Sequence, residues 1–208
     1  DVFFENKLLQ RVLDGLCSAL TAGDGNREIL DRISGNAAQD PGFLARLAWY
    51  AAFDPREGVL ESLLGGSGGD FEAVLFFGRV LAAPFVTHAV GGLKREGVGL
   101  PKSLGMCPWC GSPPGLARLT GDEGRRLLCC SLCGETWPYA LLKCPTCRHE
   151  EGQDRLWLDP DDPCFIQVCG NCRAYLKTVD ERKLPTGESV IPLVWDTATM
   201  HLDLIALG

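Results

Sequence analysis

Eight of the eleven cysteines in this chain form four Cys-x-x-Cys pairs, all in the second half of the sequence. A pair with this spacing turns the chain so that two sulfurs point at one place, and two such pairs supply the four thiolates of a tetrahedral metal site. One pair alone would also fit a redox motif, but four within about 65 residues predict two separate four-sulfur sites. We call each pair a knuckle and number the knuckles in chain order: Cys107/Cys110, Cys130/Cys133, Cys144/Cys147 and Cys169/Cys172.

The knuckles can be paired in two ways. Nineteen residues separate the first knuckle from the second and twenty-one separate the third from the fourth, but only ten separate the second from the third. Each of the longer intervals contains a predicted β-hairpin, which favours the sequential pairing of first with second and third with fourth. A cross-brace, first with third and second with fourth, is the alternative.

A closed tetrahedron of thiolates accepts either Zn²⁺ or a single Fe ion. Structural zinc would hold together a ribbon that lacks the core to fold alone, whereas iron would allow a redox or sensing role. The residues leave both open. Sulfur fills every ligand position, so none remains to activate water, and we expect no enzyme here. No nucleophile elbow, phosphate-binding glycine loop or dinucleotide fingerprint occurs in the sequence.

The other candidate residues carry weaker signals. Cys129 lies beside a knuckle and could be an exchangeable metal ligand or a redox thiol, but we expect a strand cysteine that faces the core. We expect His149 to be an exposed turn residue, although it is close enough to the third knuckle to replace a ligand. The remaining candidates are predicted to be core residues or to lack a partner: Cys17, Cys164, His88, His201, Trp109, Trp137 and Trp157.

Composition describes an ordinary globular protein, with 46% hydrophobic and 23% charged residues. The formal net charge is −7, and both halves are acidic: residues 1–100 carry 9 Lys and Arg against 13 Asp and Glu, and residues 101–208 carry 11 against 14. Both halves would repel a phosphate backbone, which counts against nucleic-acid binding. The regular pairs and the odd number of cysteines favour reduced thiols in a cytoplasm over a disulfide scaffold.

The first hundred residues predict an all-helical domain. Apolar residues recur at helical spacing between Leu9 and Leu20. Asp40-Pro41 and Asp54-Pro55 are helix start signals, the second with Glu57 placed for a capping box. After the glycine-rich break at 65–69, a long helix is predicted from Asp70 to 91–92. Because Arg79, Pro84 and His88 interrupt its apolar run, we expect a buried helix rather than a membrane span, and no secretory signal is visible.

The composition changes near 98–101, and short strands, turns and knuckles follow. Segments 116–120 and 125–129 flank a hairpin turn, as do 155–158 and 165–168, so the region reads as a duplicated unit of knuckle, strand, turn, strand and knuckle. A closing strand is expected at 174–179 and a helix at 196–206. The fold class is therefore α+β, with a helical domain before two tandem rubredoxin-like or zinc-ribbon modules of short antiparallel strands. The expected domains are 1–98, 99–141, 142–182 and 183–208.

At the knuckles the chain resembles the formate dehydrogenase accessory protein family, FdhE. The stretch around Cys107-Pro108-Trp109-Cys110-Gly111 carries the resemblance most clearly, and the other knuckles follow in the same order and spacing. The matching segments are 100–114, 128–133, 143–147, 169–172, 174–177 and 198–203. The helical first half is similar only in character.

The resemblance implies a cytoplasmic, non-catalytic protein that binds the catalytic subunit of a molybdenum- or tungsten-containing formate dehydrogenase and assists its maturation. It implies that the eight knuckle cysteines are metal ligands, and it shifts the expected metal towards iron. No nucleic acid and no membrane insertion are expected. A zinc-ribbon adaptor for nucleic acid or protein, and a rubredoxin-type electron carrier, are the alternative functions.

Overall fold

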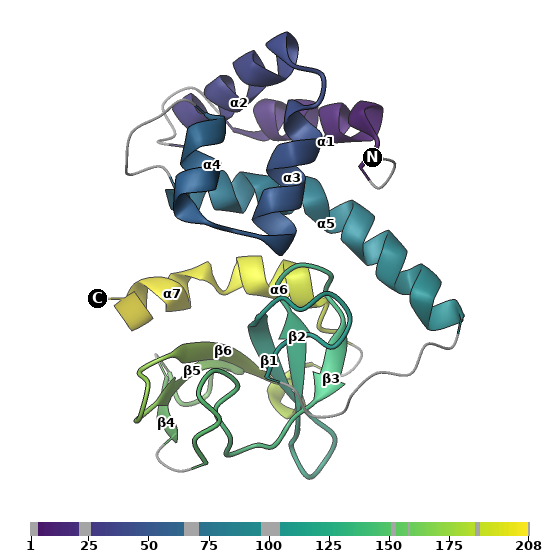
Figure 1. The fold of residues 1–208 in the computed structure, drawn as a ribbon. Helices are drawn as coiled ribbons and strands as arrows, with labels where there is room; N and C mark the ends of the chain where they lie inside the picture. Colours follow the sequence, from purple (N-terminus) through teal and green to yellow (C-terminus); the bar gives the residue numbers. More distant parts are fainter. Residues whose placement is uncertain are drawn as a thin grey trace. The chain divides into compact units, whose positions relative to one another are not determined.

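The computed structural model describes residues 4–20, 26–64, 71–96, 105–150, 153–157, 159–185 and 188–207. The chain divides into two compact units, Asp1–Gly91 and Gly92–Gly208. Helices make up the first unit, and a β-sheet with C-terminal helices makes up the second (Figure 1). The predicted α+β class is therefore confirmed, whereas the predicted boundaries within the second unit stay predictions.

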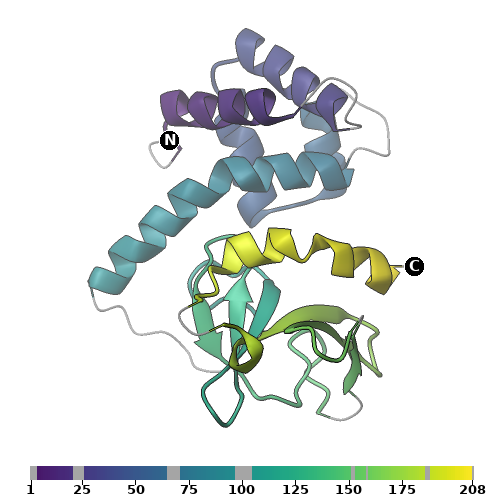
Figure 2. The same cartoon turned by 180° about the vertical axis from the view of Figure 1, so that it is seen from behind.

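Five helices are described up to Arg95: α1 (Asn6–Ala19), α2 (Arg27–Gln39), α3 (Phe43–Phe53), α4 (Glu57–Leu63) and α5 (Phe71–Arg95). The last four residues of α5 fall in the second unit. Helices α3 and α4 lie in front of α5 in Figure 1 and behind it in Figure 2. Leu9 and Leu13 of the predicted apolar face of α1 are fully buried. Their burial with Leu30, Leu47 and Leu81 gives the first unit its core.

Helix α3 begins at Phe43, later than the Asp40-Pro41 signal predicted, because Asp40 closes the preceding helix instead. The amide of Asp40 donates to the Asn36 carbonyl, and the carboxylate of Asp40 accepts from the amide of Gly42 at 2.9 Å. Helix α4 also begins later than its Asp54-Pro55 signal predicted, at Glu57, and the Asp54 carboxylate pairs with Arg56. The glycine-rich break and Asp70 lie outside the described residues.

Helix α5 is long and apolar enough, by length and composition, to cross a membrane, with a mean hydropathy of 1.6. The core helix of a soluble protein passes the same test. Eight of its residues are buried, among them Val74, Phe77 and Leu81. This burial agrees with the predicted core helix. The helix also continues past the predicted end at 91–92 to Arg95.

One mixed sheet contains all six strands described in the second unit: β1 (Pro114–Thr120), β2 (Arg125–Cys130), β3 (Thr136–Pro138), β4 (Gln153–Leu156), β5 (Cys164–Cys169) and β6 (Tyr175–Asp180). The strand order is β3-β2-β1-β6-β5-β4. Neighbours pair antiparallel except β1 and β6, which pair parallel from Leu116–Lys177 to Leu119–Asp180.

The strand order agrees with the predicted duplication, and each repeated unit has a third strand besides its hairpin. Each half contributes a knuckle, two hairpin strands, a second knuckle and a last strand, and the two three-strand blocks stand side by side in the same sense. The turns at Gly121 and Gly124 have φ of 65° and 63°, which glycine adopts without strain. The two ribbons are therefore joined through the β1–β6 seam rather than by a linker alone.

The chain then forms a 3₁₀ turn (η1, Glu181–Lys183) and two short helices, α6 (Pro192–Ala198) and α7 (Met200–Leu207). A single helix starting at Asp196 was the expectation, and it is wrong in both start and continuity. Pro192 occupies the first turn, and Thr199 leaves the helical conformation between the two helices. Leu202 packs with Leu116, Ile166 and Val179 in the core of this unit.

Candidate metal centres

The four knuckles share one backbone geometry. In each, the amide of the first cysteine donates to the carbonyl five residues later, at 2.8 to 2.9 Å. The amide four residues after the first cysteine donates back to its carbonyl, at 2.9 to 3.3 Å. These two bonds close a tight turn that directs both sulfurs to one side. The residue after each second cysteine has a left-handed φ: Gly111 76°, Gly134 71°, Arg148 63° and Arg173 60°.

The sulfurs converge as two separate groups of four. The first centre contains the first and second knuckles, and the second centre contains the third and fourth. Within each centre the four sulfurs lie within 4.8 Å of one another. The sequential pairing is therefore confirmed and the cross-brace is not formed. The reason is visible in the sheet, since each centre lies at the end of its own hairpin, β1–β2 or β4–β5.

The spacing of the sulfurs fits a metal ion. Cys107 and Cys133 lie 3.7 Å apart, and Cys110 lies 3.3 Å from Cys130 and 3.6 Å from Cys133. In the second centre, the Cys144–Cys172 and Cys147–Cys169 separations are both 3.7 Å. Metal–sulfur bonds of about 2.3 Å in a tetrahedron require sulfurs about 3.8 Å apart, and all eleven cysteines are free of disulfides. Two closed sites for Zn²⁺ or Fe thus match the donor set.

Backbone amides and neighbouring thiols shape the charge of the sulfurs. A hydrogen bond with the Cys107 side chain lowers the pKa of Cys110, whereas one with the same side chain raises the pKa of Cys133. The amide of Cys172 lowers the pKa of Cys169 to about 6. Four thiolates at this spacing repel one another, and a divalent cation between them removes that repulsion.

The two centres differ in exposure. In the first centre, Cys107, Cys130 and Cys133 are buried, at 1 to 3% exposure. In the second, Cys144 and Cys169 are buried but Cys172 is exposed. The neighbours of Cys172 in the fourth knuckle, Gly170 and Asn171, are exposed as well. The second centre therefore has an exposed cysteine, whereas in the first only Cys110 is partly exposed.

Two residues that the sequence analysis missed hold the centres in place. The buried guanidinium of Arg126 donates from Nη1 to the carbonyls of Ala140, Leu141 and Lys143, the last at 3.0 Å. It thereby fixes the segment that leads into the third knuckle, and burial lowers the pKa of Arg126 to about 10. Gly105 packs directly against the carbonyl of Pro145, where any side chain would overlap. A charged residue inside an apolar strand was the available signal for Arg126.

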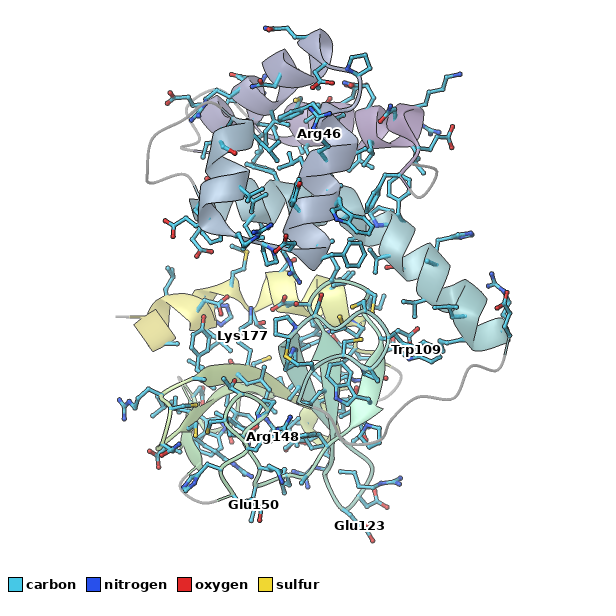
Figure 3. All side chains as sticks on the ribbon, in the orientation of Figure 1. Arg46, Trp109, Glu123, Arg148, Glu150 and Lys177 are labelled. Atoms are coloured by element: carbon cyan, nitrogen blue, oxygen red, sulfur yellow. The ribbon has the colours of Figure 1, made fainter. Side chains whose placement is uncertain are left out.

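A buried charge cluster, also missed, ties the C-terminal helices to the sheet. Lys177 on β6 has a side chain only 6% exposed, and its Nζ lies 2.6 Å from Oδ1 of Asp196 and 2.8 Å from Oδ2 of Asp203. Tyr175 donates to the other oxygen of Asp203 at 3.1 Å. These residues line a cavity of 330 Å³ beside Gly115, and Figure 3 labels Lys177 within the unit. The cluster anchors α6 and α7 at the β1–β6 seam.

Most of the weaker candidates lie where they were expected, and among the exceptions are Cys17 and Trp157, which are less buried than core residues. Cys129 and Cys164 are buried core residues, and burial raises the pKa of each to about 12. His149 is exposed and joins neither sulfur group, and the same holds for His88 and His201. Cys17 is only half-buried on α1. Trp137 is buried at 5%, whereas Trp157 is 42% exposed, although its ring lies against Phe165 at 5.1 Å.

Comparison with known proteins gives consistent results. No family model matches the chain. Among curated proteins, it is 39% identical over 104 residues to an FdhE homologue of Stutzerimonas stutzeri, covering 48% of this chain and 33% of that protein. It is 35% identical over 140 residues to one of Pseudomonas aeruginosa (63% and 44%), and 29% over 189 residues to one of Pseudomonas putida (85% and 58%). The chain thus spans about a third to three-fifths of the length of these relatives.

The fold has a counterpart among solved structures. The crystal structure of the FdhE protein from Pseudomonas aeruginosa matches with a TM-score of 0.55 and 21% sequence identity, covering all of this chain and 91% of that one. At 21% identity this match shows similarity of fold only. Evidence for a common family comes from the curated relatives. Together with the order and spacing of the knuckles, the curated relatives support the FdhE family for this chain, and the solved structure agrees with its fold.

Proposed function

We propose that this chain is a metal-binding accessory protein that binds the catalytic subunit of a molybdenum- or tungsten-containing formate dehydrogenase in the cytoplasm and assists formation of the active enzyme. The observation that carries the proposal is the pair of closed four-sulfur groups in a chain similar to FdhE homologues. The eight knuckle cysteines are the proposed ligands.

The geometry supports a binding role over catalysis. Each proposed metal ion would have four sulfur ligands and no open position for substrate or water. When bound, Zn²⁺ would supply rigidity, and Fe would supply in addition a one-electron couple. The residues of the chain orient the sulfurs through the knuckle turns and offset thiolate charge with amides such as those of Cys172 and His149.

Both metals remain compatible with the sulfur spacing, because the ideal tetrahedra for Zn²⁺ and Fe differ little in size. Elemental analysis with an optical spectrum of purified protein distinguishes them. Red protein with two equivalents of iron identifies rubredoxin-like centres, and colourless protein with two equivalents of zinc identifies structural ones. A reversible one-electron couple without binding to the dehydrogenase would instead identify an electron carrier.

Copurification and complementation test the proposed function. A tagged formate dehydrogenase catalytic subunit should retain the full-length protein, and a strain lacking the gene should lose formate dehydrogenase activity. The wild-type gene and a Cys17→Ser control should restore activity, whereas Cys107→Ser and Cys144→Ser should not. Full rescue by both knuckle variants would refute a role for the metal centres, and absence of copurification would refute the partner.

A further inference from the structure

We propose that the exposed rim of the second centre, formed by Arg148 and Arg173, is a docking surface for an acidic segment of the partner protein. This inference rests on the proposal that the chain binds a protein partner, and it adds the place and the chemistry of that contact. Figure 3 labels Arg148 within the second unit.

Backbone conformation singles out these two arginines. Across the described residues, Arg148 and Arg173 are the non-glycine residues with a positive φ, at 63° and 60°. They occupy the position that Gly111 and Gly134 occupy in the first centre, at 76° and 71°. A side chain in the left-handed region strains the backbone, and glycine removes that strain. The duplicated halves of the unit therefore accept glycine here, yet the second centre carries arginine twice.

The surroundings of Arg148 and Arg173 indicate that their side chains are available to a binding partner. Both arginines are exposed and follow the second cysteines of knuckles whose sulfurs lie within 4.8 Å of one another. In the described part of the chain, no hydrogen bond joins either guanidinium to a sulfur, whereas the Asn171 side chain donates to Cys147. No ion pair engages Arg148 or Arg173 there, whereas the nearby cation Lys143 is paired with Glu150 at 2.9 Å.

Two guanidinium forks beside an exposed centre suit carboxylates. Arginine binds a carboxylate through two parallel hydrogen bonds, and arginine is enriched where protein interfaces gain most of their energy. Backbone amides of the knuckles offset part of the charge of the nearby thiolates. Both guanidinium groups are positively charged and exposed, and the proposed partner is a protein, so we assign an acidic protein segment as the occupant.

The test compares three metal-loaded, full-length proteins: wild type, Arg148→Gly/Arg173→Gly, and the control Arg11→Ala/Arg125→Ala, which removes two exposed arginines elsewhere. Binding to the formate dehydrogenase catalytic subunit and to a labelled poly-glutamate peptide is measured at low and physiological salt. The glycine variant should bind both probes about tenfold or more weakly, keep two metal ions and melt at a temperature equal to or above that of wild type. The control should bind as wild type does.

Every other outcome overturns the inference. Unchanged binding by the glycine variant shows that the rim is not the docking surface. Loss of one metal ion or a lower melting temperature shows that the arginines instead balance the charge of the centre. Tighter binding of an oligonucleotide than of poly-glutamate shows a nucleic-acid surface. If wild type binds poly-glutamate through the rim but does not bind the subunit, the proposed partner fails while the rim's preference for acidic chains stands.

Discussion

The ammonium group of Lys177 lies 2.8 Å from the carboxylate of Asp203, joining strand β6 to the last helix across 26 residues of sequence. The same nitrogen contacts both the side chain and the backbone carbonyl of Asp196. The buried ammonium group thus has two hydrogen bonds and an additional ion pair, which is how a lysine is tolerated below the surface. The contact lies at the seam where the two ribbon halves of the sheet meet.

Replacing Lys177 by Met should destabilise the protein by about 3–5 kcal/mol, because two carboxylates would lose their cation in a partly buried site. Urea denaturation of the metal-loaded protein measures this. Lys143→Met is the matched control, since Lys143 pairs with the exposed Glu150, and it should cost no more than about 1 kcal/mol. Equal losses in the two variants would contradict an anchoring role for Lys177.

Arg126 and Arg125 are neighbours on β2 with opposite environments, which makes a second matched pair. Arg126→Met leaves three carbonyls of the segment before the third knuckle without their donor and should cost about 2–4 kcal/mol. Arg125 is exposed, and Arg125→Met should change stability by less than about 0.5 kcal/mol. Thermal and urea unfolding compare the two. A small effect of Arg126→Met would show that the knuckle turns alone fix that segment.

Local signals made the knuckles and hairpins predictable. A Cys-x-x-Cys turn and a glycine turn such as that at Gly121 and Gly124 are each encoded within a few residues, so their geometry follows from the sequence alone. Pairing of the knuckles was predictable because each hairpin brings its own two ends together. The relation between Lys177 and Asp203 was not, since no local pattern joins a strand residue to a helix residue so distant in sequence.

The parallel β1–β6 seam escaped prediction for the same reason. Alternation within a strand indicates which face is buried but does not identify the neighbouring strand. At the break between α6 and α7, the hydroxyl of the buried Thr199 lies within hydrogen-bond distance of the carbonyls of Trp195 and Asp196. Such side-chain competition with helical hydrogen bonds depends on packing rather than on periodicity.

Helix α5 approaches α3 closely at Gly78, and this contact should be intolerant of a methyl group. A Cβ at this position would lie 2.5 Å from Cβ of Ala51 and 3.2 Å from the Leu47 carbonyl. Gly78→Ala should therefore destabilise the protein by about 1–3 kcal/mol. Gly35→Ala on α2, where nothing lies within 4 Å, should stabilise it by about 0.5–1 kcal/mol. Thermal unfolding checks both, and stabilisation by Gly78→Ala as well would show that α3 and α5 can separate at Gly78 without cost.

Chelation should remove the two proposed metal ions in separate phases. Because Cys172 is exposed while three of the four sulfurs of the first centre are buried, a chelator reaches the second centre first. Metal release to a colorimetric chelator should show a fast phase and a slow phase of one equivalent each. The melting temperature should fall with each phase, since binding of metal by the folded protein alone stabilises it.

Single variants assign the phases. Cys172→Ser should weaken the second centre and leave only the slow phase, whereas Cys107→Ser should leave only the fast phase. Cys17→Ser, which alters a cysteine on α1 outside both groups, should keep both phases and serves as the control. Retention of the fast phase in Cys172→Ser would mean that the first centre is the labile one. In that case exchange would be governed by opening of the β1–β2 hairpin rather than by the exposure of the sulfurs.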